Sequence, residues 1–266
     1  MLNHDSLDTL CAALAYAIGV EAPACAAKAN ETMVRFLEET LGGEKVDRIF
    51  MYNPDAIAQW VCDKYPAYIQ EVIDRTQLRL PMQVVMPSVT PVCFGTMYTG
   101  AQPAVHGIRS YVKPVIQIDS IFDALIRAGK KPVIVSNGEN SLSKIFLERN
   151  MDYFIVQKKE EVLAKAAQLI VEDTYDFIVV YDEDYDSTMH RNGTESPQAL
   201  AALRSNAKTF AMYDAMIQNC WKKHTSLVGF AMDHGCHDID GGCGSHGLDM
   251  EEDLNISHYY TIHKAE

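Results

Sequence analysis

The 266-residue sequence predicts an α/β protein with a mostly parallel central sheet covered by helices on both faces. Short apolar segments alternate with amphipathic helical segments, as in parallel strands joined by helical crossovers. The chain contains 48% hydrophobic and 22% charged residues, which is typical of a globular protein. A chain of this length can bury one large core, so we expect a single main domain.

The expected strands are apolar runs that end at turn-forming or polar residues. They cover residues 46–52, 82–86, 132–136, 153–156, 176–181 and 225–232, with 256–263 as an edge strand or cover. Helical periodicity and capping residues predict helices at 57–64, 90–98, 120–128, 141–149, 158–171 and 196–221.

Residues 1–42 are predicted to form a helical appendage to a domain spanning 43–266. Two Ala-rich helices are expected in the appendage, at 6–18 and 23–41, with a stop at Gly42-Gly43. They carry no recognisable chemistry, so we interpret them as a packing or dimerisation segment. A homo-oligomer is one expectation from this interpretation.

Charge and composition exclude several classes of partner. The net charge of −13 argues against binding a nucleic-acid polymer or an anionic membrane, since both need clustered Lys and Arg. No apolar run approaches the ~20 residues of a membrane span, and the first residues do not resemble a secretion signal, so a cytoplasmic protein is expected. Seven cysteines without a regular framework favour reduced thiols.

A Thr-Pro pair, Thr90-Pro91, begins the helix expected after the strand at 82–86. Pro suits the first turn of a helix, so Thr90 is predicted to be its N-cap. A hydroxyl at this helix end, beside the carboxyl end of a strand, lies where open α/β sheets bind phosphates. A capping role alone is the alternative interpretation.

Two further segments carry residues that suit a divalent metal. Asp186 and His190 lie four residues apart after the strand at 176–181, so one turn would bring their side chains together. Asp233-His234-Gly235 ends the strand at 225–232, and the glycine allows the chain to turn there. Taken alone, the Asp186 segment would more often be a solvated loop.

Two more positions complete the set. Asp55 follows the first strand, where it would either bind a metal or cap the next helix. His246 lies in Gly-Ser-His-Gly, eleven residues beyond Gly235. A structural zinc site formed by Cys236, His237, Cys243 and His246 is an alternative, although it lacks the usual paired cysteines.

The frame Thr90, Thr99-Gly100, Pro103 and His106-Gly107 resembles the nucleophile segment of the alkaline phosphatase superfamily. It looks closest to the type I phosphodiesterase/nucleotide pyrophosphatase family, and the resemblance extends from residue 46 to 247. It implies an alkaline phosphatase-like fold with a catalytic domain at 43–266 and a structural role for His106. The implied ligands are Asp55, Thr90, Asp233 and His234 for one metal, and Asp186, His190 and His246 for the other.

The resemblance implies a metal-dependent hydrolase of phosphodiester or pyrophosphate bonds. Thr90 would attack phosphorus and form a phosphothreonine intermediate, with two divalent ions, zinc or else manganese, stabilising the charges. A small phosphorylated or nucleotide substrate is expected. Phosphomonoester or phosphonate hydrolysis, and a metal-binding homologue with impaired catalysis, are the alternatives.

Two positions next to the nucleophile depart from what the resemblance implies. Cys93 occupies a position expected to donate a hydrogen bond to the phosphoryl group, and a thiol is a poor donor. Pro91 has no N–H to offer. Cys93 and Asn137 are the predicted substrate contacts, and Asn137, Tyr185 or a helix from another subunit would have to replace the lost donors.

Overall fold

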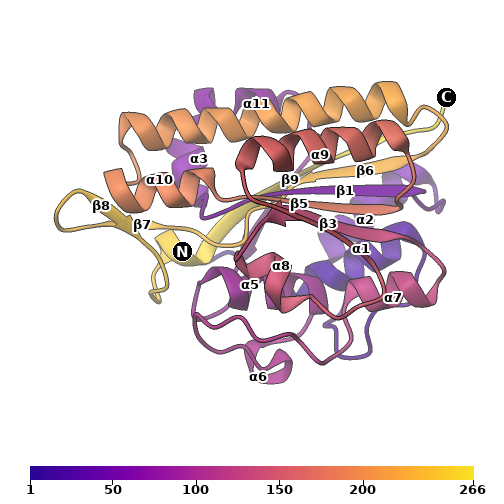
Figure 1. The fold of residues 1–266 in the computed structure, drawn as a ribbon, viewed down its shortest axis with the longest axis horizontal. Coiled ribbons are helices and arrows are strands. Elements are labelled where there is room, and N and C mark those ends of the chain that lie inside the picture. Colours follow the sequence, from indigo (N-terminus) through magenta and orange to yellow (C-terminus); the bar gives the residue numbers. More distant parts are fainter.

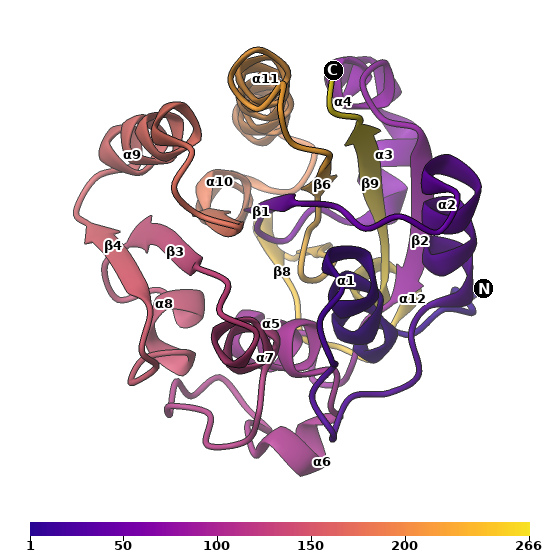
Figure 2. The same ribbon diagram turned by 90° about the vertical axis from the view of Figure 1, so that its right-hand side faces the viewer.

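A seven-stranded sheet forms the centre of the computed structural model, which describes residues 1–266 (Figure 1). The strand order is β2-β9-β6-β1-β5-β3-β4. Helices cover both faces, with α9 and α11 on one side and α1, α5 and α7 on the other (Figure 2). The predicted α/β class with a mostly parallel sheet is confirmed. The strands are β1 (Arg48–Pro54), β2 (Leu78–Gln83), β3 (Pro132–Asn137), β4 (Asp152–Val156), β5 (Phe177–Asp182), β6 (Ser226–Phe230) and β9 (Asn255–His263).

The register of the central strands decides which segments meet at the end of the sheet. Strand β1 pairs in parallel with β5 and β6, with Pro54 opposite Asp182 and Tyr52 opposite Phe230. The carboxyl ends of these three strands therefore lie side by side. The segments that follow them are brought together at one edge, where ligands of open α/β sheets bind.

The helices pack on the sheet through one core of 74 buried residues. Strands β1 and β5 are buried almost throughout, which explains why their sequences are continuous apolar runs. The longer helices are α1 (Leu10–Ile18), α2 (Glu31–Leu41), α5 (Thr90–Thr99), α7 (Ile121–Arg127), α9 (Lys159–Glu172), α10 (Asp184–Asn192) and α11 (Pro197–Cys220). Shorter ones are η1 (Leu7–Thr9), α3 (Gln59–Lys64), η2 (Pro66–Tyr68), α4 (Gln70–Ile73), α6 (Pro103–His106), α8 (Ser141–Ile145) and α12 (Glu251–Leu254).

The N-terminal segment contributes to this same core. Leu10 and Leu14 of α1 are fully buried, and the helix contacts α5 and α7. The predicted helix at 23–41 is wrong in its first part, because the helix begins only at Glu31. Asn30 caps it by accepting a hydrogen bond from the Met33 N–H at 2.9 Å. Whether residues 1–42 fold independently of 43–266, or mediate dimerisation, stays a prediction.

Three other elements differ from the sequence-based expectation. Strand β9 is not an edge strand, since it pairs antiparallel with β2 on one side and with β6 on the other. Strand β2 (Leu78–Gln83) begins before the predicted 82–86 run and ends within it, and it forms the edge of the sheet instead. The short hairpin of β7 (His237–Ile239) and β8 (Cys243–Ser245) was not predicted, because each strand is only three residues long.

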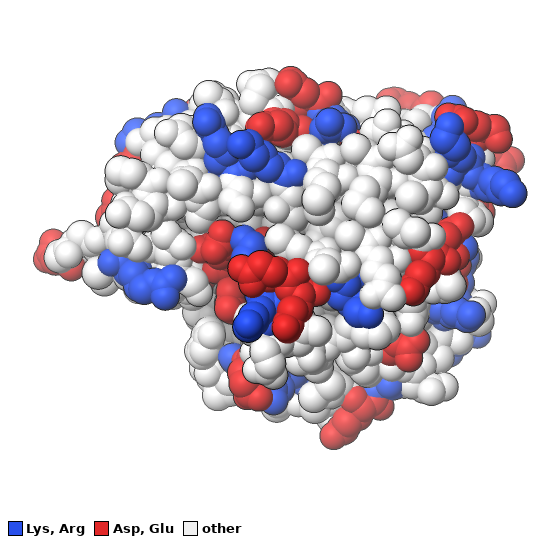
Figure 3. All heavy atoms as spheres, turned by 45° about the horizontal axis from the view of Figure 1, so that its top comes forward, with Lys and Arg blue, Asp and Glu red and all other residues white.

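The surface gives few further constraints. None of the helices is both long enough and apolar enough to cross a membrane. On the face drawn in Figure 3, acidic and basic side chains lie in small mixed groups rather than in one broad basic patch. All seven cysteines are free thiols.

Candidate metal centre

A first cluster of metal-ligating side chains, here called the first triad, consists of Asp55, Asp233 and His234. Asp55 follows β1 directly, and the other two follow β6, so the parallel pairing of these strands brings them together. All three are buried. His234 Nε2 lies 3.3 Å from Asp55 Oδ1 and 3.4 Å from Asp233 Oδ2.

Thr90 points its hydroxyl at this triad. Its Oγ1 lies 3.4 Å from Asp55 Oδ2 and 3.3 Å from His234 Nε2, and the side chain is buried. The prediction that Thr90 is an N-cap is wrong: Val89 occupies the cap position of α5, and no side chain caps the helix. Asp55 does not cap the following helix either, since Ala58 precedes α3. Neither Thr90 nor Asp55 therefore caps a helix.

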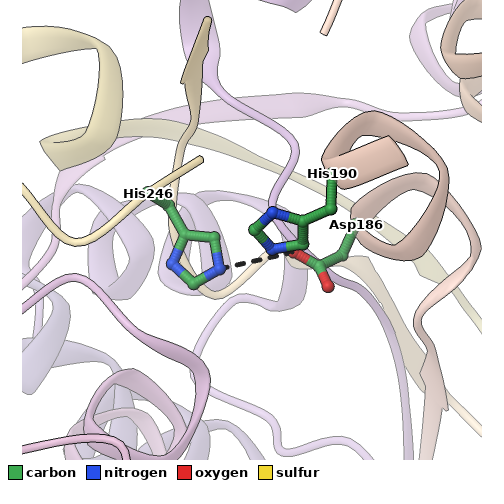
Figure 4. A group of neighbouring side chains, drawn as sticks. All are labelled: Asp186, His190 and His246. Carbon is green, nitrogen blue, oxygen red and sulfur yellow. Dashed lines mark ion pairs between the residues drawn. The ribbon is translucent and has the colours of Figure 1, made fainter. Parts of the chain in front are cut away.

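A second triad consists of Asp186, His190 and His246 (Figure 4). Asp186 and His190 lie one turn apart on α10, which is a full helix where the sequence predicted a polar segment with one turn. His246 follows β8 and reaches the same point from the hairpin. Asp186 Oδ1 lies 3.2 Å from His190 Nε2 and 3.5 Å from His246 Nε2.

The two triads are neighbours. The rings of His234 and His246 have centroids 4.1 Å apart, and those of His190 and His246 are 5.0 Å apart. The structure thus brings together all seven residues that the sequence singled out as nucleophile or metal ligands, from segments up to about 190 positions apart. Their grouping also matches the division into two sets that the resemblance implies.

The donor atoms of both triads suit cations. Three buried carboxylate oxygens, Asp55 Oδ1, Asp186 Oδ1 and Asp233 Oδ2, have no hydrogen-bond partner in the protein. Buried oxygens without a partner are costly, and a bound cation would remove that cost. Carboxylate and imidazole ligands in these combinations fit zinc and similar divalent ions.

The histidines are oriented for the same role. The Nδ1 atoms lie close to backbone carbonyl oxygens: His190 to Gly244 at 2.9 Å, His234 to Gly235 at 3.0 Å and His246 to Ser88 at 3.1 Å. A carbonyl only accepts, so each Nδ1 carries the proton and each Nε2 presents its lone pair to the triad. This is the outer hydrogen bond typical of metal-bound histidines.

The triads differ in their electrostatics. Burial and the charge of Asp186 raise the pKa of Asp55 to about 7, and burial with the charge of Asp55 raises the pKa of Asp233. Burial lowers the pKa of His234. In the second triad, burial works against the charged carboxylate of Asp186, but the adjacent imidazoles of His190 and His246 outweigh it and lower the pKa of Asp186. Without a cation, the first triad disfavours charge and the second one favours it.

Two residues support the first triad and were missed in the sequence. Tyr181, near the end of β5, donates a hydrogen bond from its hydroxyl to Asp55 Oδ2. Ala56 donates its N–H to Asp233 Oδ1 at 3.2 Å and has a φ of +61°. This left-handed backbone favours a glycine, so the alanine at this position gave no sequence signal for the contact. The tyrosine gives no signal, since a Tyr in a buried strand is ordinary.

The predicted substrate contacts lie at different places. Cys93 is buried on α5 with Sγ 4.0 Å from the Val85 carbonyl oxygen. Asn137, at the end of β3, donates to Glu183 Oε1 at 2.6 Å, so its amide is already engaged. Tyr185 is fully buried and donates to the Thr194 carbonyl oxygen at 2.9 Å. A substrate contact at Cys93 or Asn137 stays a prediction.

Tyr111 is a further side chain near the triads that the sequence did not single out. Partial burial and then the negative charges of Asp55 and Asp186 raise the pKa of its hydroxyl. The residue nevertheless remains 59% exposed. Its position in an irregular segment after α6 gives no periodic signal, which is why sequence reasoning passed over it.

The alternative zinc site is not formed. Cys236 lies 3.8 Å from the Tyr185 hydroxyl, and His237 pairs with Asp253, while His246 belongs to the second triad. His106 also stays outside both triads. Its ring packs on Gly95 and its Nε2 lies 3.1 Å from Thr96 Oγ1, as a structural histidine would.

Comparison with solved structures shows which fold this chain shares. Murine ectonucleotide pyrophosphatase/phosphodiesterase 5 superposes with a TM-score of 0.57 at 18% identity, covering 73% of this chain and 58% of that one. Its inactive form with a Thr-to-Ala substitution, in complex with AMP, gives 0.58 at 17% identity over 73% and 59%. Both are structures of a member of the alkaline phosphatase superfamily. The chain has an alkaline phosphatase-like fold.

A second kind of enzyme shares this fold. Phosphonoacetate hydrolase from Sinorhizobium meliloti 1021, in complex with phosphonoformate, gives a TM-score of 0.51 at 17% identity over 76% of this chain and 61% of that one. The alkaline phosphatase-like chain described here therefore spans about three fifths of the length of these solved chains. No family model matches the sequence, and no curated protein matches it either.

Proposed function

We propose that this protein is a metal-dependent hydrolase of phosphoric esters, with Thr90 as its nucleophile and two divalent ions as its cofactors. The observation that carries the proposal is the position of the Thr90 hydroxyl. It lies within 3.4 Å of ligand atoms of the first triad, beside a second triad built from unrelated segments. The only hydrogen-bond contacts of this buried hydroxyl are to Asp55 and His234 of the first triad.

Each of the seven residues has a role in this proposal. Asp55, Asp233 and His234 would hold one ion with Thr90, and Asp186, His190 and His246 would hold the other. The two ions, zinc or manganese, supply charge that lowers the pKa of the hydroxyl and stabilises the attacking and leaving oxygens. Thr90 Oγ1 would form its bond to phosphorus while the bond from phosphorus to the leaving oxygen breaks on the opposite side, and the hydroxyl proton would pass to solvent. Water would then cleave the phosphothreonine, releasing the phosphoryl product and restoring the Thr90 hydroxyl.

Phosphodiester or pyrophosphate substrates are the favoured class. The support is the fold shared with a nucleotide pyrophosphatase/phosphodiesterase whose form lacking a threonine is inactive and binds AMP. Phosphonate or phosphomonoester hydrolysis is the second candidate, because phosphonoacetate hydrolase shares the fold as well. The substrate would be a small phosphorylated or nucleotide molecule, and we place the protein in the cytoplasm.

The phosphoryl oxygens need hydrogen-bond donors, and the nucleophile helix offers few. Pro91 has no N–H, and the N–H groups of Val92 and Cys93 both donate to the Val89 carbonyl oxygen at 3.0 Å. The role of donor therefore has to fall to a side chain outside this helix. If no residue fills it, the protein is a metal-binding homologue with impaired catalysis, since losing one such donor costs ~100-fold or more.

The test is hydrolysis of a nitrophenyl phosphodiester, the matching monoester and a nitrophenyl phosphonate, with added zinc or manganese. Faster cleavage of the diester supports the favoured class, and preference for one of the others moves the substrate class. Absence of turnover with all three, while two ions bind, would leave only the metal-binding homologue.

A further inference from the structure

Asp253 is a buried carboxylate just outside the triads that the proposed chemistry does not use. It lies in α12, a four-residue helix, and its side chain is 0% exposed. Both of its carboxylate oxygens accept hydrogen bonds: Oδ1 from His237 Nδ1 at 2.7 Å and Oδ2 from the Leu248 N–H at 2.8 Å. A buried carboxylate is expensive, so this one is held for a purpose that the packing alone does not give.

The carboxylate of Asp253 is connected to the second triad. Leu248 is two residues beyond His246, so the bond to its N–H fixes the segment that carries the last ligand of that triad. Leu248 itself is 55% exposed. The His246 segment is therefore held on both sides of the ligand, by the bond from His246 Nδ1 to the Ser88 carbonyl oxygen and by the bond from the Leu248 N–H to the Asp253 carboxylate.

The backbone of α12 is connected to the first triad. The Asp253 carbonyl oxygen accepts the Gly235 N–H at 2.9 Å, and the Glu252 carbonyl oxygen accepts the Cys236 N–H at 3.1 Å. These donors directly follow His234. A Cβ on Gly235 would overlap the Glu252 carbonyl oxygen, so the approach of the two segments is as close as a glycine permits.

We propose that Asp253 is a positioning residue that holds the histidine ligands of the two triads at a fixed separation. It anchors the His246 segment through its carboxylate and the His234 segment through its carbonyl, with His237 holding the carboxylate in place. This inference rests on the proposed two-ion function, but its test reads ion binding and does not need turnover.

The structure offers a matched control for a substitution of Asp253. Asp214, on α11, is also 0% exposed and pairs with a histidine, His263, at 2.6 Å. His263 lies opposite Ser226, at the start of β6, which is the end of the sheet remote from the triads. Asp214→Ala therefore removes a buried Asp–His pair without touching either triad.

The experiment is titration of the metal-free protein with Zn²⁺, followed by calorimetry and by metal counting after gel filtration. In Asp253→Ala we expect the binding of one of the two ions to weaken about 10–100-fold, the usual loss for an outer hydrogen bond of a metal ligand. Asp253→Asn, which can still accept from Leu248, should recover part of that loss. Asp214→Ala should bind both ions as the unaltered protein does.

The affected ion can be identified with a second substitution. In an Asp186→Ala background, which removes the second ion, Asp253→Ala should change the remaining affinity little, because the two substitutions act on the same ion. Leu248→Pro, which removes only the N–H donor, should reproduce the loss seen in Asp253→Ala.

Unchanged affinity for both ions in Asp253→Ala would overturn the proposal, and so would an equal loss in Asp214→Ala. Failure of the unaltered protein to bind a second ion would overturn it as well. A protein that binds two ions but hydrolyses no ester would count against the proposed function alone and leave the role of Asp253 standing.

Discussion

The two triads hold comparable ligands in very different surroundings. The first grows out of the ends of β1 and β6 and is fully buried, so the sheet itself sets its geometry. The second joins a helix to a hairpin, and the side chains of Asp186, His190 and His246 are 18%, 40% and 8% exposed. We therefore expect the triads to have different roles: the buried first triad would activate the nucleophile, and the more exposed second triad would contact solvent and substrate.

The largest expected effect concerns the Thr90 hydroxyl at the first triad. Thr90→Ala should lower kcat by at least ~10³-fold, as loss of a nucleophile does in comparable enzymes, while both ions remain bound. Thr96→Ala on the same helix is the control, since the Thr96 hydroxyl faces His106 instead. Steady-state kinetics with a nitrophenyl phosphodiester measure both. Activity surviving in Thr90→Ala would remove Thr90 from the mechanism.

The next effect separates the triads by affinity. The first triad supplies two carboxylates and the second supplies one, so the first should bind a divalent ion ~10–100-fold more tightly. Stepwise dialysis against a chelator should release one ion first, and Asp186→Asn should abolish binding of that weaker ion. Release of the first-triad ion before the other would reverse this assignment.

A smaller effect concerns fold stability and two glycines beside the triads, Gly235 and Gly244. A Cβ on Gly235 would lie 2.0 Å from the Glu252 carbonyl oxygen, while one on Gly244 would lie 2.4 Å from the Met189 sulfur and 2.9 Å from the Met189 carbonyl oxygen. Gly235→Ala should therefore destabilise the fold by about 1–3 kcal/mol and Gly244→Ala by less. Urea denaturation of the metal-free variants gives both values, and the opposite order would contradict the packing argument.

The smallest effect is a pH dependence of the metal-free protein. The pKa of Asp55 is raised to about 7 and that of Asp233 is also raised, so their contribution to stability is present below pH ~4 and lost as the pH rises toward 7 and above. The raised pKa values of His190 and His246, which result from hydrogen bonds to Asp186, act in the same direction above pH 6.5.

The chelated protein should accordingly be less stable at pH 8 than at pH 6, by on the order of 1 kcal/mol. Thermal melts at the two pH values measure this. Added Zn²⁺ should raise the Tm more at pH 8, because the ions bind deprotonated ligands. In Asp55→Asn the pH difference should shrink; an unchanged difference would assign it to other groups.

The sequence determined the class of fold, because buried strands and helices show as apolar runs or periodic patterns within short segments. The strand predicted at 176–181 became β5 at Phe177–Asp182, and the helix predicted at 196–221 became α11 at Pro197–Cys220. Both are long and strongly patterned. The residues of the two triads were also found in the sequence, since they follow apolar runs and carry residue types with a narrow range of uses.

Only the tertiary structure decided the matters that depend on contacts distant in sequence. The pairing of β9 with β2 and β6 places it inside the sheet, although its own residues are equally suited to an edge. Tyr181, Ala56 and Asp253 support the triads through bonds to segments 16 to 177 positions apart in the chain, some to backbone groups. Such bonds leave no periodic pattern, because a backbone N–H is present in almost every residue. The residues that meet at the triads could thus be picked out in the sequence, whereas the contacts that hold them in place could not.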